Sequence, residues 1–275
     1  MTSYKLSLHS HPTNFAHLIF TSPNKEKYFD NLLKILHRKK GNIVLGITEF
    51  NNDKRFKKFL DTIKKLKKYK ISCPYENYFF SIKKDKKEIY FIKTNEIGTD
   101  KGHILIIGFI GEIRKRKLEE VLKEAHKQKC IIIANHPLHL ENKISYFLIK
   151  KIFGSSKEPS INKKNLLKYK KDFDAIELNS YFPEDWKNIK KFSKQNKVQL
   201  VSDSDAHFLD EIFTSFYEVK NLNFKNPSSF KKSLKKSLKR NLSLHSGKAG
   251  YSAKYKHALE ILFENFWKKI GIIKN

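Results

Sequence analysis

Short apolar runs alternate with segments of helical periodicity along most of the chain. The apolar runs predict strands at 4–9, 43–48, 103–110, 130–137, 174–178, 198–202 and 213–219. Amphipathic patterns predict helices at 24–40, 53–69, 117–129, 143–171, 183–196, 228–240 and 251–270. Two aromatic-rich runs around a Lys-Asp turn predict a hairpin over 78–92. Repeated strand–helix units with nearly continuous apolar strands indicate an α/β fold with a mostly parallel sheet, either open or closed into a barrel.

The composition fits a globular protein. The chain has 275 residues, of which 39% are hydrophobic, enough for one large α/β domain with a smaller appendage. The longest apolar run, 104–110, is far shorter than a membrane span, and the first residues lack the apolar core of a signal peptide. Cys73 and Cys130 have no metal-type spacing. We therefore expect a reduced, cytoplasmic protein that is not bound to a membrane.

The charge of the chain is strongly basic. The formal net charge is +29, and only five of the 57 basic residues are arginines. A basic surface favours anionic partners, including nucleic acid. However, enrichment in Lys, Asn, Ile and Phe is also what an AT-rich coding bias produces, and a dedicated nucleic-acid surface would use more arginine. The charge thus predicts a phosphorylated, anionic substrate and leaves a nucleic-acid partner open.

Polar residues with metal-ligating side chains stand where separate predicted strands end. A single histidine in such a place is more often structural than a ligand, and an HxH pair arises easily by chance. Seven such residues are harder to explain separately, and imidazoles mixed with carboxylates suit Zn²⁺, Mn²⁺ or Fe²⁺. We expect two or three divalent ions that share a bridging carboxylate. The seven residues are His9, His11, Glu96, His103, His136, Asp205 and His207.

The order of these motifs resembles the PHP (polymerase and histidinol phosphatase) superfamily of metal-dependent phosphoesterases. The motifs are HxH, then E…GH, then HP, then SDAH, and the connecting segments "IVLGITEFN" and "DAIELNS" are also similar. The resemblance covers roughly residues 4 to 220. It implies a distorted (β/α)7 barrel, here followed by a basic helical C-terminal extension. We accordingly expect a phosphoesterase domain at 1–222 and a basic helical segment at 223–275.

The resemblance also implies roles for individual residues. His9 and His11 match the first ligand pair, and Glu96 matches the carboxylate that bridges two ions. His103 and His136 match the ligands of the second ion. The closing pair of ligands corresponds to Asp205 and His207, with Asp203 left as a supporting residue.

Three segments depart from the family pattern. Ser7 replaces an aspartate two residues before HxH, and Ala16 replaces another aspartate, for which the neighbouring His17 is a candidate substitute ligand. In the segment that usually reads TDH, Glu49 and Phe50 stand in place of aspartate and histidine. Phenylalanine cannot bind a metal, so the third ion position is expected to lack this ligand of the family pattern.

The expected activity is hydrolysis of a phosphate ester by a metal-bridged hydroxide, with Glu96 and His207 as catalytic residues. Arg114, Arg116 and Glu49 are candidates for substrate binding. The substrate would be a nucleotide or small phosphomonoester. One alternative is an exonuclease-like 5′–3′ phosphodiesterase on short RNA or DNA, and another is a catalytically weakened metal-binding protein.

Overall fold

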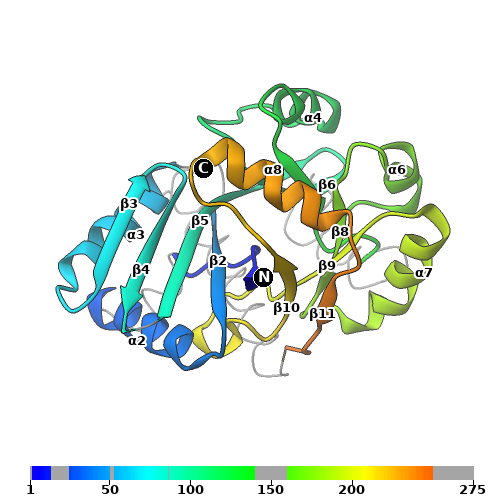
Figure 1. The fold of residues 1–275 in the computed structure, drawn as a ribbon. Coiled ribbons are helices and arrows are strands. Elements are labelled where there is room, and N and C mark those ends of the chain that lie inside the picture. Colours follow the sequence, from blue (N-terminus) through cyan, green and yellow to red (C-terminus); the bar gives the residue numbers. More distant parts are fainter. Residues whose placement is uncertain (1, 14–24, 50–52, 86, 140–159, 250–275) are drawn as a thin grey trace, which may run out of the picture.

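The computed structural model describes residues 2–13, 25–49, 53–85, 87–139 and 160–249 (Figure 1). The predicted helix at 251–270 and the first part of the predicted helical region 143–171 lie outside these residues. In the described part of the chain, no helix is long and apolar enough to cross a membrane.

Among the described residues, eleven strands form one mixed sheet, and helices lie between and around them. The strands are β1 (Ser3–Ser7), β2 (Asn42–Glu49), β3 (Lys70–Tyr75), β4 (Phe79–Lys84), β5 (Lys87–Thr99), β6 (Gly102–Ile107), β7 (Ile131–Ala134), β8 (Ala175–Asn179), β9 (Leu200–Asp203), β10 (Phe216–Lys220) and β11 (Ser243–His245). The helices are α2 (Lys25–Arg38), α3 (Asp53–Lys65), α4 (Leu118–Lys127), α6 (Lys163–Lys168), α7 (Trp186–Asn196) and α8 (Pro227–Leu238).

The direction of the strands differs from the expected mostly parallel sheet. The order is β11-β10-β1-β2-β5-β6-β7-β8-β9, with β3 and β4 attached beside β5. The pairs β1–β2, β2–β5, β7–β8 and β8–β9 are parallel. Strand β6 is antiparallel to both neighbours, because a short turn after β5 reverses the chain before any helix can form. As a result, the start of β6 lies beside the end of β5.

The two ends of this sheet approach each other, so the sheet is nearly closed like a barrel (Figure 1). Ser10, just after β1, forms a parallel bridge with Ala206, just after β9. The His11 N–H donates to the Ala206 carbonyl at 2.8 Å, and the Asp205 N–H donates to the His9 carbonyl at 2.9 Å. This architecture is compatible with a distorted barrel, while the count of seven repeated units stays a prediction.

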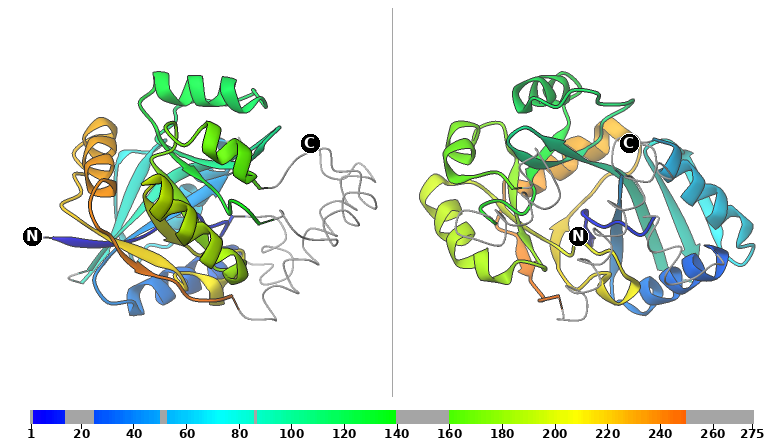
Figure 2. Two further views of the ribbon diagram at one scale, coloured as in Figure 1. Left: turned by 90° about the vertical axis from the view of Figure 1, so that its right-hand side faces the viewer. Right: turned by 180° about the vertical axis from the view of Figure 1, so that it is seen from behind.

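Three apolar clusters hold the sheet and helices together. Helices α2 and α3 pack over β2, β4 and β5, whereas α4, α6 and α7 pack over β6, β7 and β8 (Figure 2). The third cluster joins inward-facing residues such as Leu6 and Val201 to Phe230, Leu234 and Leu238 of α8. The apolar stripe of α8 therefore packs among the inward-facing side chains, and β11 extends the same sheet beyond residue 222.

Gly46 allows β2 to approach the tail of β1 closely. A Cβ atom at this position would lie 2.0 Å from the Leu8 carbonyl oxygen, which belongs to backbone and cannot rotate away. We expect Gly46→Ala to lower the free energy of unfolding by roughly 3 kcal/mol, measured by urea denaturation. Gly98→Ala is the matched control, because its new Cβ would come no closer than 3.3 Å to a neighbour, the His103 side chain. Equal stability of Gly46→Ala and wild type would contradict this close approach.

Candidate metal centre

The extended segment after β1 places His9 and His11 in the interior of the sheet. Both residues are buried, with 0% and 1% of their surface exposed. Because alternate residues of an extended segment point to the same side, the two rings lie together in an edge-to-face arrangement, and their Nε2 atoms are 3.2 Å apart. The backbone is fixed on both sides, since the Ser10 carbonyl accepts the Thr48 N–H at 2.8 Å and the His9 carbonyl accepts from Asp205.

Glu96 lies at the centre of the histidines. It is on β5 and is 5% exposed. Its Oε2 is 3.3 Å from His11 Nε2. Its Oε1 is 3.1 Å from His103 Nδ1 and 3.3 Å from His136 Nε2. His103 reaches this point because it stands at the start of the antiparallel β6, directly across from Gly98.

The segment after β9 completes the cluster. The Asp205 Oδ1 atom is 3.1 Å from His9 Nε2, 3.4 Å from His11 Nε2 and 3.6 Å from His207 Nε2. The rings of His11 and His207 stack with their centroids 4.7 Å apart. Asp205 has a φ of 50°, which Asp adopts more easily than most residues, and this conformation lets the chain turn after β9.

These contacts form three overlapping groups of side chains that could each hold a metal ion. In each group the potential ligand atoms lie within 4.8 Å of one another. Glu96 belongs to two groups and His11 to two, so neighbouring ions would share ligands. Buried imidazole nitrogens and carboxylate oxygens suit a divalent cation of the Zn²⁺, Mn²⁺ or Fe²⁺ type. The groups are His9–His11–Glu96, Glu96–His103–His136 and His11–Asp205–His207.

The electrostatics of the cluster also favour a cation. Burial opposes the charged form of His9, but Asp205, Glu177 and Glu96 hold its pKa well above the ordinary value. Burial likewise opposes the charged carboxylates, yet His9 holds the pKa of both Glu96 and Asp205 well below the usual range. Without metal, protons on the imidazoles thus provide the positive charge that the carboxylates require. Metal ions in the same place would release these protons.

Three supporting residues were not predicted from the sequence. The Glu177 Oε1 atom lies 2.7 Å from His9 Nδ1. The Asn135 amide donates to Glu96 Oε1 at 3.2 Å, and the Asn179 amide donates to Asp205 Oδ2 at 2.9 Å. For Glu177 the sequence does contain a signal, because a charged residue at this position interrupts the buried run of β8.

The structure does not bring all candidate site residues together. Arg114 has an 83% exposed side chain that pairs with Glu112, and Arg116 donates to main-chain carbonyls nearby. Within the described ranges, neither guanidinium contacts the cluster. His17 and Phe50 lie outside the described residues, so the third ion position stays a prediction.

Glu49 stands at the end of β2, opposite Asn95 of β5, and is fully buried. Burial lowers the pKa of Lys93 to about 8, and the nearby charge of Glu49 opposes this shift because it favours the protonated amine. Glu49 therefore has an electrostatic role inside the fold. Its predicted role in substrate binding remains a prediction.

A fourth group of potential ligands lies near the rim of the cluster. His139 Nδ1 is 2.8 Å from Asp185 Oδ2, and Glu184 is close enough to join them. The centroid of the Phe182 ring is 3.3 Å from that of His139 and 5.9 Å from that of His136. No role for His139 is predicted from the sequence.

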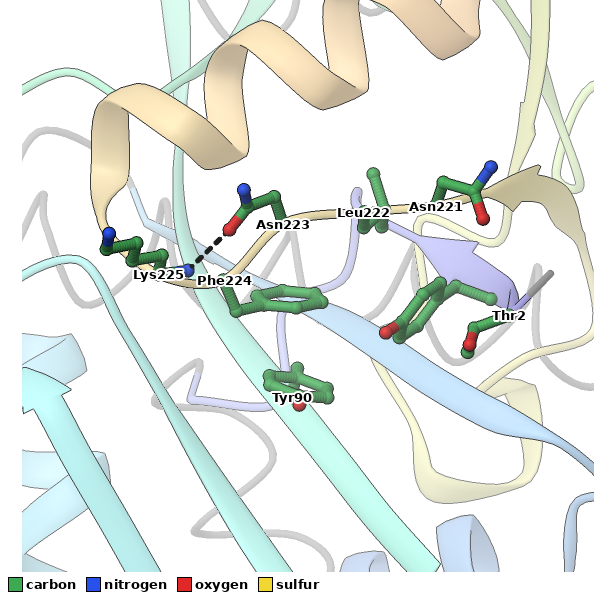
Figure 3. A pocket seen from close by; sticks show the side chains of 8 residues that line it. Thr2, Tyr90, Asn221, Leu222, Asn223, Phe224 and Lys225 are labelled. Atoms are coloured by element: carbon green, nitrogen blue, oxygen red, sulfur yellow. Dashed lines mark hydrogen bonds between the residues drawn. The ribbon is translucent and has the colours of Figure 1, made fainter.

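A pocket of about 530 Å³ lies elsewhere on the molecule (Figure 3). Tyr90 and Phe224 stack there with centroids 3.7 Å apart, and Tyr4 lies next to Phe224. Tyr4 is near the start of β1, whereas His9 follows its end, five residues or roughly 16 Å along an extended chain. The pocket is therefore at the opposite end of the sheet from the metal-binding groups.

Comparison with known proteins identifies a similar fold. No protein-family description and no curated protein matches the sequence. The crystal structure of PsfC from Pseudomonas syringae PB-5123 covers 96% of this chain and 98% of its own, with a TM-score of 0.59 and 10% identity. The lesion-specific endonuclease PfuEndoQ from Pyrococcus furiosus shows 17% identity over 88% of this chain and 57% of its own, with a TM-score of 0.45. The first comparison shows a shared fold, and the second is below the level that does so.

Proposed function

We propose that the protein is a metal-dependent hydrolase of phosphate esters. The observation that carries this proposal is the shared use of Glu96 and His11 by overlapping groups of potential ligands. Such sharing is expected where two or more ions act together on one phosphate. The resemblance of the sequence motifs to PHP phosphoesterases supports the same reaction class.

The side chains of the cluster would have different roles in this reaction. His9, His11, Glu96, His103, His136 and Asp205 would hold divalent ions. When bound, these ions would supply a water activated near neutral pH and would stabilise charge on the phosphate oxygens. His207, which belongs to one of the three ligand groups and is 6% exposed, would hold a further ion or donate a proton to the leaving alcohol. The net charge of +29 would attract an anionic substrate.

The sequence leaves three hypotheses, two about the substrate and one about the loss of activity. A nucleotide or small phosphomonoester is the first. The second is a short RNA or DNA cleaved as a diester, for which the basic segment 228–257 would provide affinity. However, the apolar residues of α8 already have a structural role in the core. A metal-binding protein with weakened catalysis is the third, because Phe50 replaces a histidine of the family pattern.

Removal of metal tests the proposal directly. We expect chelation to lower phosphate-ester hydrolysis at least about a thousandfold, and Mn²⁺ or Zn²⁺ to restore it, because the ions activate the water. The assay would use a 5′-labelled short RNA and a nucleoside monophosphate, with products resolved by length and free phosphate counted.

The products separate the three hypotheses. Shortening of the RNA to mononucleotides, with rates that fall as salt rises, would indicate a phosphodiesterase. Phosphate release without shortening would indicate a phosphomonoesterase. Tight metal binding without turnover would indicate the non-catalytic alternative, and absence of metal binding would contradict the proposed function.

A further inference from the structure

Glu177 is a fully buried carboxylate that contacts two segments of the candidate metal centre. It lies in the middle of β8 and is 0% exposed. Its Oε1 is 2.7 Å from His9 Nδ1, and its Oε2 accepts the backbone N–H of His136 at 2.7 Å. The Asn179 side-chain amide donates to the same Oε2 at 3.3 Å. One side chain therefore joins the segment after β1 to the segment after β7.

The contact with His9 determines how that ring is presented. Because the carboxylate accepts, the proton of this hydrogen bond is on Nδ1, and Nε2 remains available to the cluster. Nε2 is the atom that lies 3.1 Å from Asp205 Oδ1 and 3.6 Å from Glu96 Oε1. A carboxylate in this position fixes the orientation and tautomer of a ligating histidine and makes it a stronger ligand.

The contact with His136 acts on the backbone. His136 has a φ of 25°, which non-glycine residues rarely adopt. Its N–H points to Glu177 in this conformation, and its Nε2 then lies 3.3 Å from Glu96 Oε1. Glu177 thus fixes candidate ligands of two different groups at once.

We propose that Glu177 is a positioning residue that sets the metal affinity of the centre by orienting His9 and His136 together. This inference rests on the proposed function, since it assumes that the cluster binds metal. The three neighbours of Glu177 all present N–H groups, so both of its oxygens must accept. Glutamine has nearly the same shape but only one accepting oxygen, and its amide would face a donor.

The test compares Zn²⁺ affinity of wild type, Glu177→Gln and Glu218→Gln, measured by competition with a chromophoric chelator. Glu218→Gln is the matched control, because Glu218 forms a glutamate–histidine pair with His245 at 3.4 Å on the outer strands. We expect Glu177→Gln to weaken Zn²⁺ binding about 10- to 100-fold and Glu218→Gln to leave it unchanged. Equal affinity of Glu177→Gln and wild type would overturn the inference.

A measurement on the wild type covers the case in which Glu177→Gln does not fold. In the Zn²⁺-loaded protein, the His9 Nδ1 proton should give a low-field NMR signal that exchanges slowly with water. Exchange as fast as in an exposed imidazole would also overturn the inference. If the wild type binds no Zn²⁺, the proposed function itself is wrong, and the two failures are therefore distinguishable.

Discussion

Replacing Glu96 by glutamine is expected to reduce metal-dependent phosphate-ester hydrolysis at least about a thousandfold. The substitution preserves the volume of the side chain but removes the charge shared by His11, His103 and His136. Because Glu96 belongs to two of the ligand groups, its loss should affect two ions rather than one. Turnover and bound metal would be measured on the same preparation, the latter by elemental analysis.

The control for this experiment is another glutamate on the same strand. Glu88 of β5 accepts a hydrogen bond from Ser81 Oγ at 2.6 Å, at the opposite end of the strand from the cluster. Glu88→Gln should retain both activity and metal. If Glu96→Gln kept full metal content and activity within tenfold of wild type, Glu96 would not be the bridging carboxylate.

Removing the Asp203 side chain is expected to lower stability more than changing its charge. Asp203 Oδ1 accepts the N–H groups of Leu8 at 2.5 Å and His9 at 3.3 Å, and the residue is fully buried. Asp203→Ala leaves both donors without this acceptor, which should lower the free energy of unfolding by about 2–4 kcal/mol. Asparagine keeps an accepting oxygen in the same place, so Asp203→Asn should fold as well as the wild type.

The pKa of Asp203 predicts a second difference, between the pH dependence of stability of Asp203→Asn and that of wild type. Burial and the charge of Glu177 raise the pKa of Asp203 well above the ordinary value of a carboxyl group. A raised pKa stabilises the fold below the unfolded-state pKa and loses this contribution as the pH rises. Asparagine has no such dependence, so Asp203→Asn should lose stability less steeply than wild type as the pH increases from 4 to 7. Denaturant titrations of the metal-free proteins would measure both effects. Equal stability of Asp203→Ala and wild type would contradict the first, and an equal dependence of stability on pH in Asp203→Asn and wild type would contradict the second.

The candidate ligands could be predicted because their chemistry is visible in the sequence. Histidines and carboxylates near the ends of apolar strands are unusual, and His9, His11, Glu96, His136 and Asp205 lie in one cluster. The expectation that all candidate ligands stand where strands end was only partly right, because Glu96 lies within β5. His103 stands at the start of its strand, since the reversal of β6 brings it to the same end of the sheet.

Strands β3 and β11 and the contacts of Glu177 could not be predicted from local sequence patterns. Strand β3 contains Pro74, which disfavours a strand. Among the described strands, however, β3 pairs with β4 alone, and proline is tolerated at a sheet edge. Strand β11 has three residues and obtains its position from pairing with β10. The role of Glu177 depends on contacts with residues 41 and 168 positions away, which no local pattern encodes.

The closure of the sheet between residues 8–11 and 203–206 has a consequence for biosynthesis. Leu8 and Asp203 are 195 positions apart. At about 5–20 residues per second, the ribosome adds Asp205 and His207 roughly 10 to 40 s after His9 and His11. During this interval His9 and His11 lack Asp205 and His207, the later members of the same cluster. Completion of the centre is therefore expected to be a late event in the folding of the nascent chain, after most of the barrel has been synthesised.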